Sequence, residues 1–202
     1  MQIVRSVEEL HAAYGEPGEA ALVKVMAFLT DEYRRMIEAS PFVAIATVGP
    51  EGTDCSPRGD DGAVIHIEDS RTLILPDWRG NNRIDTLANI VRDPRLSLMF
   101  LIPGSNSVLR VNGEAVVTMD EAVTHRFEMN GKHPRSAIVI TIGEVYFQCA
   151  RAVMRADLWN PEKYVDPKAL PTAGEMTKGA MAGFDNETYD REWPERAAKT
   201  MW

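Results

Sequence analysis

The spacing of apolar residues changes from helical to strand-like near residue 40. Thr30 precedes Tyr33, Met36 and Ile37, which share one helical face, and Ser40-Pro41 ends that helix because a residue before proline avoids the helical region. Residues 42–48 are almost continuously apolar and rich in β-branched side chains, which predicts a strand buried on both faces. Similar patterns predict further strands at 53–58, 63–68, 72–75, 96–102, 108–119 and 136–150.

Helical spacing returns twice between these strands. Ile84, Leu87, Ala88 and Val91 predict a helix over residues 80–91, and Asp120 begins a second one that reaches about residue 129. Short connections between six or seven sequential strands favour antiparallel pairing and closure into a barrel. We therefore expect a mainly β, α+β fold whose barrel occupies residues 30–160. Residues 1–29 form a helical extension, and residues 161–202 form a C-terminal arm with short helical pieces, placed at a dimer interface.

Composition narrows the class of protein. A length of 202 residues suits one domain, and a net charge of −8 argues against a nucleic-acid binder, which needs a basic surface. No apolar run approaches the ~20 residues that cross a bilayer, and the N-terminus has no signal-peptide pattern, so we expect a cytoplasmic protein. Cys55 and Cys149 stand far apart, and the four histidines lack the spacing of metal ligands, so we expect no metal site. For Cys149 we expect a buried thiol, and for Cys55 a packed one.

Arginine and amide side chains gather where two predicted strands end. Arg58, Gly59 and Asp60 follow one strand, and Gly80-Asn81-Asn82-Arg83 lies between another strand and a helix. A helix N-terminus offers free N–H groups, and arginine presents a rigid fork that matches phosphate oxygens. Two interpretations stay open from the residues alone: a phosphate-binding loop, or a polar helix cap with solvated arginines.

The same segments resemble the pyridoxamine 5′-phosphate oxidase-like flavoproteins. The likeness spans roughly residues 28–160 in order and rests on three stretches: residues 40–60, residues 73–100 and residues 110–115, which read Arg-Val-Asn-Gly-Glu-Ala. It implies a split β-barrel that binds FMN at the interface of a homodimer. It also implies that Arg58 and residues Gly80 to Arg83 hold the phosphate, and that the backbone of Leu75, Pro76 and Asp77 borders the isoalloxazine ring.

The chain departs from the family pattern at several of these positions. Asn81 and Asn82 replace a serine and a basic residue, and Val108 replaces a glutamine that contacts the flavin from the partner subunit. Arg110 and Ser107 are candidate substitutes for that glutamine. Trp159 is either a cover for the partner's flavin or an interface aromatic.

The resemblance implies an FMN-dependent oxidoreductase that acts on a small-molecule substrate or a nicotinamide donor, and we name no catalytic residue. Three alternatives remain: a non-catalytic flavin- or haem-binding protein, a deazaflavin-dependent reductase on the same fold, and a structural dimer whose flavin site has decayed. Turnover of a reduced coenzyme separates the enzymes from the binding proteins.

Overall fold

Seven antiparallel strands form a single sheet in the computed structural model, which describes residues 1–201. Their order across the sheet is β2-β1-β5-β6-β7-β4-β3. The strands are β1 (Phe42–Gly49), β2 (Gly52–Gly59), β3 (His66–Ile67), β4 (Thr72–Asp77), β5 (Arg95–Leu101), β6 (Val108–Thr118) and β7 (Ser136–Gln148). The antiparallel split barrel predicted from the sequence is confirmed.

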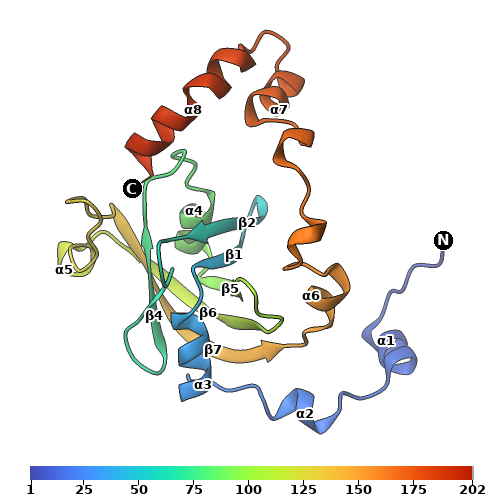
Figure 1. The fold of residues 1–202 in the computed structure, drawn as a ribbon. Helices are drawn as coiled ribbons and strands as arrows, with labels where there is room; N and C mark the ends of the chain where they lie inside the picture. Colours follow the sequence, from blue (N-terminus) through green and yellow to red (C-terminus); the bar gives the residue numbers. More distant parts are fainter. Residues whose placement is uncertain (202) are drawn as a thin grey trace.

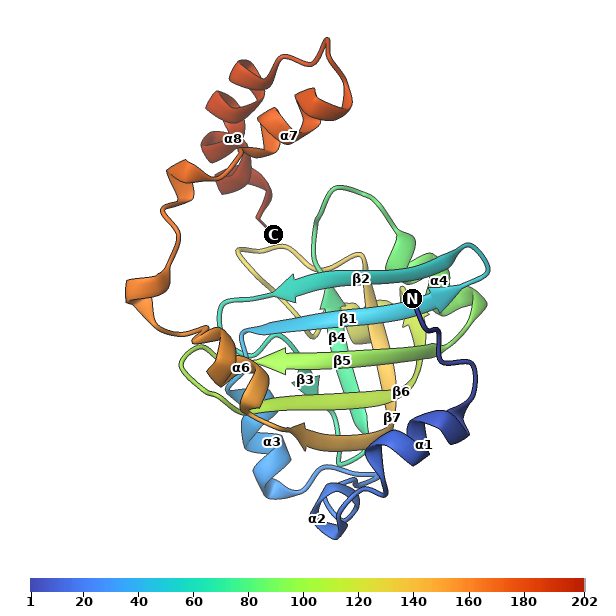
Figure 2. The ribbon, with the colours of Figure 1, turned by 90° about the vertical axis from the view of Figure 1, so that its right-hand side faces the viewer.

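Strand β7 joins the two halves of the barrel. It pairs with β6 along nearly all its length and with β4 through its first residues, where Ser136 is opposite Asp77 and Thr141 opposite Thr72. In Figure 2 the strands β2, β1, β5, β6 and β7 lie side by side, and β4 crosses behind them. Between Asn112 and Gly113 the register shifts by one residue, because Gly143 of β7 is left unpaired and forms a bulge that bends β7 in the middle of this pairing.

The core fills the space enclosed by the curved sheet. Fully buried side chains include Ile45, Leu98, Phe100, Ile138 and Ile140. Strand β1 alternates, however: Val43, Ile45 and Thr47 are buried, while the residues between them are only half-buried. The sequence predicted that β1 is buried on both faces, but within one chain only one face is buried. The other face lies on the outer surface of the sheet.

Helix α3 (Asp31–Glu38) plugs one end of the barrel. Thr30 caps it by accepting the N–H of Tyr33, and Tyr33 and Ile37 point into the core. Ser40, which is buried, then donates to the carbonyl oxygen of Leu101 at 2.9 Å. This bond fixes where the chain leaves the helix and enters β1.

The two helices inserted between strands are shorter than predicted. Helix α4 (Asp85–Arg92) begins five residues after Gly80, because Asn82 adopts a left-handed conformation with φ of 59°. Helix α5 is a single turn (Glu121–Thr124), and a loop continues from it to β7. Residues 80–84 are therefore a loop, not the first turn of a helix.

Both ends of the chain extend away from the barrel (Figure 1). At the N-terminus lie α1 (Val7–Tyr14), which Ser6 caps, and α2 (Glu19–Leu22). After β7 come α6 (Arg151–Ala156), the 3₁₀ turns η1 (Pro161–Lys163) and η2 (Pro167–Ala169), α7 (Ala173–Ala180) and α8 (Asn186–Thr200). Asp190 of α8 accepts hydrogen bonds from the Thr172 hydroxyl and the Gly174 N–H, which fixes the α7–α8 hairpin.

The length of α8 differs from the short pieces expected for the arm. None of its residues is buried, so no apolar stripe marks it in the sequence. The two cysteines also differ from expectation: both are free and exposed, so neither Cys55 nor Cys149 is a packed core thiol. Among the described residues, no helix combines the length and apolar character that a membrane span requires.

Candidate functional site

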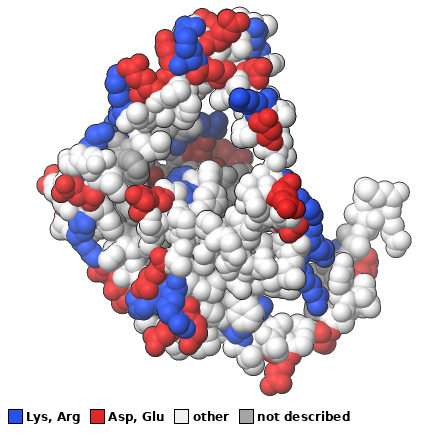
Figure 3. All heavy atoms as spheres, viewed as in Figure 1, with Lys and Arg blue, Asp and Glu red and all other residues white. Residues whose placement is uncertain are grey.

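A cavity of about 1090 Å³ opens where β2 and β4 end and β7 begins. The surface is hollowed between the barrel and helices α7 and α8, and side chains of both charges surround this hollow (Figure 3). Ten of the twelve residues predicted from the sequence to bind a cofactor line the cavity. They are Arg58, Gly59, Asp60, Leu75, Pro76, Asp77, Gly80, Asn81, Asn82 and Arg83.

The lining of this cavity includes apolar residues. Val64 and Leu75 are buried core residues, and Leu87, Val117 and Met119 also line the cavity. The arginine and amide side chains of the two predicted segments belong to the same lining. A planar aromatic ring with a charged tail matches this combination, because the ring needs apolar surface and the tail needs donors.

A second cavity of about 520 Å³ adjoins the first and shares Pro57, Arg58, Gly80, Asn81 and Arg83 with it. Here Arg58 donates from Nη2 to the Thr86 hydroxyl oxygen at 3.3 Å, and that hydroxyl donates to Asp54 at 2.5 Å. Ser56 also donates to Asp54, at 3.1 Å. Asp54 therefore anchors the chain of hydrogen bonds that orients the Arg58 guanidinium.

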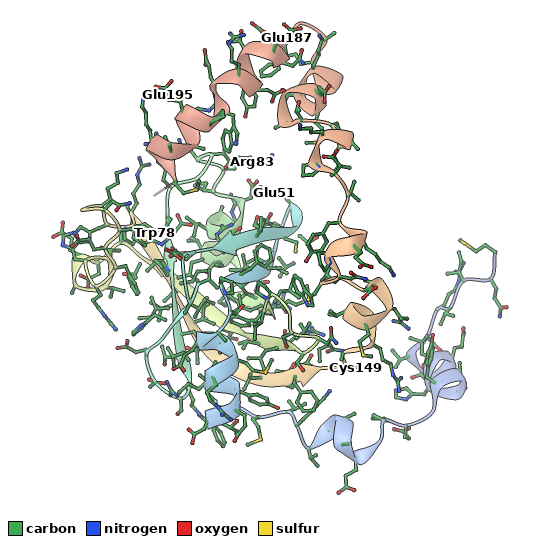
Figure 4. All side chains as sticks on the ribbon, in the orientation of Figure 1. Glu51, Trp78, Arg83, Cys149, Glu187 and Glu195 are labelled. Carbon is green, nitrogen blue, oxygen red and sulfur yellow. The ribbon has the colours of Figure 1, made fainter. Side chains whose placement is uncertain are left out.

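Arg83 is held less firmly than Arg58. Its guanidinium pairs with Asp85 at 2.7 Å, and 76% of its side chain is exposed. Its backbone N–H donates to the Asn81 side-chain oxygen at 3.0 Å, which shapes the loop. Figure 4 shows Arg83 and Trp78 on the segment that leads from β4 to α4. An anion could draw Arg83 away from Asp85, because an exposed ion pair contributes little stability.

The two arginines of the smaller cavity face two aspartates. Arg58 and Arg83 line the smaller cavity together with Asp54 and Asp85, so these four side chains sum to no net charge. A dianionic phosphate would gain from the arginine forks and lose from the carboxylates. The arrangement therefore supports anion binding through oriented donors more than through an excess of positive charge.

Asp77 is the one lining carboxyl with a raised pKa. It is half-buried at the end of β4, and burial is the main cause that raises the pKa of its carboxyl. The positive charge of Arg58 and a hydrogen bond from Ser136 act in the opposite direction. The sequence predicted only a backbone role for this residue, yet its side chain also lines the cavity.

Arg110 and Trp159, the other two predicted residues, do not line the cavity of their own chain. Arg110 lies on β6 with its guanidinium 5.4 Å from the centre of the Tyr146 ring. Trp159 lies in the arm and donates its indole N–H to the Ser105 carbonyl oxygen at 2.7 Å. A role for either at a flavin requires a second subunit.

Several lining residues were missed from the sequence. Asp54, Ser56 and Arg58 alternate along β2, so a period of two could have placed Asp54 beside the predicted arginine. The loop before β7 adds Lys132, His133 and Arg135, and the end of the arm adds Met201. These last contributions depend on how distant segments fold together, so no local pattern indicates them.

Comparison with known proteins decides the family. The family model described as pyridoxamine 5′-phosphate oxidase matches residues 29–149, more than half of the chain. The chain belongs to the pyridoxamine 5′-phosphate oxidase family. The matched segment contains β1 to β7, and with them the ten predicted residues that line the cavity.

Solved structures resemble the fold at low identity. HupZ from Group A Streptococcus is 18% identical, with a TM-score of 0.50 over 59% of this chain and 93% of that one. An FMN-binding protein from Syntrophomonas wolfei is 14% identical, with a TM-score of 0.43 over 71% of this chain and 97% of that one. The first likeness bears on the fold alone. None of the curated proteins matches the chain.

Proposed function

We propose that this member of the pyridoxamine 5′-phosphate oxidase family binds FMN and acts as an oxidoreductase on a small substrate. The observation that carries the proposal is that apolar residues such as Leu75 line the 1090 Å³ cavity together with Arg58 and Arg83. Bound FMN supplies two-electron chemistry, for which the protein provides position and electrostatics. The phosphate belongs at Arg58, Arg83 and the Asn81–Asn82 loop, and the ring beside Leu75, Pro76 and Asp77.

We also infer a homodimer with the flavin at its interface. The outer face of the sheet supports it: the register places Pro57, Ala44 and Met99 side by side across β2, β1 and β5, and Met99 is 42% exposed. A flat row of small and apolar side chains suits contact with a second copy. In such a dimer Arg110, next to Met99 on β6, and Trp159 of the arm become candidates to reach the partner's flavin.

Titration of the purified protein with FMN tests the cofactor. Flavin absorbance should shift on binding, and Arg58→Ala should weaken affinity by about 10-fold to 100-fold, since hydrogen bonds to a charged group are worth about 1.5–3 kcal/mol. Arg83→Ala should have a smaller effect, because its side chain is exposed and already paired. Arg92→Ala is the matched control: Arg92 pairs with Glu51 at 2.9 Å and lines neither cavity.

Turnover separates an enzyme from a binding protein. Steady oxidation of NADPH or NADH by the FMN-loaded protein, with an artificial electron acceptor present, supports the oxidoreductase. Tight FMN binding without any turnover favours a flavin carrier. Unchanged FMN affinity in both arginine variants would overturn the phosphate assignment.

A further inference from the structure

Asp77 lines the larger cavity, so a ligand that fills the cavity must change the environment of this residue. It ends β4 directly opposite Ser136 of β7, and its carboxyl lines the larger cavity. Of the other carboxyls nearby, Asp60 in the same lining accepts the Trp78 indole N–H, and Asp85 of the smaller cavity accepts from Arg83. Asp77 faces the cavity with Ser136 as its hydrogen-bond donor and Arg58 as the nearby charge.

Two opposing influences set the proton affinity of this carboxyl before any ligand arrives. Burial favours the neutral form, whereas Arg58 and the Ser136 hydroxyl favour the carboxylate. Other charged or titratable groups also line the cavity: Asp60 and Asp61 after β2, Arg79 and Arg83 after β4, and Lys132, His133 and Arg135 before β7. Among all of these, Arg58 is the charge that favours the carboxylate form of Asp77.

Binding of FMN would change both the burial of Asp77 and the effect of Arg58, and both changes would favour the neutral form of the Asp77 carboxyl. A ring against Leu75 and Pro76 expels water from the cavity and deepens the burial of the neighbouring carboxyl. A phosphate on Arg58 compensates the positive charge that had favoured the carboxylate. The Ser136 hydroxyl does not oppose these changes. It donates a hydrogen bond to the carboxylate, but it can also accept one from a protonated carboxyl.

We propose that Asp77 takes up a proton when FMN binds and presents a neutral carboxylic acid to the bound ligand. The inference rests on the proposed function and deepens it. It gives the site a residue that holds a transferable proton at a carboxyl oxygen, next to the place where the ring would lie. The proton comes from water, so the uptake can be counted independently of any substrate.

Calorimetry counts these protons. FMN is titrated into the protein near pH 6 in two buffers with different heats of ionisation, and the difference in heat gives the number of protons bound. The FMN phosphate also titrates near this pH, with a second pKa of ~6. The comparison is therefore made between the wild type and Asp77→Asn, in which the phosphate contributes equally. The wild type should take up more protons, by at most about one per site.

The affinities should follow the same linkage. As pH rises from 5 to 8, FMN binding by the wild type should weaken relative to Asp77→Asn, by at most about tenfold per pH unit. Asp61→Asn is the matched control, since Asp61 is an exposed carboxyl at the rim of the same cavity, and it should behave as the wild type. Ser136→Ala removes the donor that favours the carboxylate before FMN binds, so Asp77 should start more protonated and the proton uptake should be smaller.

The outcomes distinguish this inference from the proposed function. FMN binding with equal proton uptake in the wild type and Asp77→Asn overturns the inference alone. The inference alone is also overturned if, as pH rises, the FMN affinity of the wild type increases relative to that of Asp77→Asn. Absence of FMN binding by the wild type at every pH overturns the proposed function, and this inference with it.

Discussion

The indole N–H of Trp78 donates to a carboxylate oxygen of Asp60 at 2.8 Å. Asp60 follows β2 and also donates its backbone N–H to the Pro41 carbonyl oxygen, while Trp78 follows β4. One side-chain bond thus connects two strand ends that are not neighbours in the sheet. Both residues line the larger cavity, so the bond fixes the width of its mouth.

Replacement of Trp78 by phenylalanine should remove the hydrogen bond between the two strand ends. The aromatic ring stays, but the N–H donor is lost, and the free energy of unfolding should fall by about 1 kcal/mol. Urea denaturation measures the loss, and FMN affinity should fall with it as the wall loosens. Trp193→Phe, on the exposed surface of α8, is the control and should leave both quantities unchanged. Identical denaturation of Trp78→Phe and the wild type would show that the bond does not hold the mouth.

Thr86 should be more important for its hydroxyl than for its size. This buried residue accepts from Arg58 and donates to Asp54, so Thr86→Val leaves both partners with one bond fewer. We expect unfolding to become easier by about 1–3 kcal/mol and FMN to bind more weakly. Thr86→Ser keeps the hydroxyl and should retain the FMN affinity. Equal affinity in the valine variant would mean that Arg58 is oriented by other contacts.

Arg95 should control the acid titration of Asp93. Hydrogen bonds from Arg95 lower the pKa of the Asp93 carboxyl to about 2. A lowered pKa stabilises the fold above the ordinary value, and that contribution is lost as pH falls toward 2. Arg95→Ala should return the pKa of Asp93 toward 3.8, which carboxyl carbon shifts in an NMR titration will show. The stability difference between the variant and the wild type should be small, constant above about pH 5 and shrink in acid.

Gly113 of β6 should tolerate no side chain opposite the β7 bulge. A Cβ there would lie 2.1 Å from the backbone carbonyl oxygen of Thr141 on the neighbouring strand. Gly113→Ala should therefore destabilise the protein by about 1–3 kcal/mol, measured by thermal or urea unfolding. Gly80→Ala is the control, because nothing lies within 4 Å of its added Cβ, and it should change stability by less than about 0.5 kcal/mol. Equal stability of the two variants would contradict the tight approach of β6 and β7.

The sequence predicted the strands well and the loops around the site less well. Alternation and β-branched residues located β1, β5, β6 and β7, since sheet pairing follows side-chain periodicity. Arg58 and Arg83, which the sequence placed in one candidate site, line the same cavity. The start of α4 was misplaced because the left-handed Asn82 leaves no signal in the apolar pattern. Met201 reaches the cavity through tertiary structure alone, and α8 lacks the buried stripe that would have revealed it.

The pairing of Asp77 with Ser136 also sets the order of events during synthesis. Strand β4 leaves the ribosome long before β7, yet within residues 1–201 it pairs only with β7 and the two-residue β3. Contacts between such distant segments form late, because a long loop must close before they gain any stability. The cavity is therefore complete only in the finished barrel. A flavin that binds there holds the native state against unfolding, and it does not guide the nascent chain toward it.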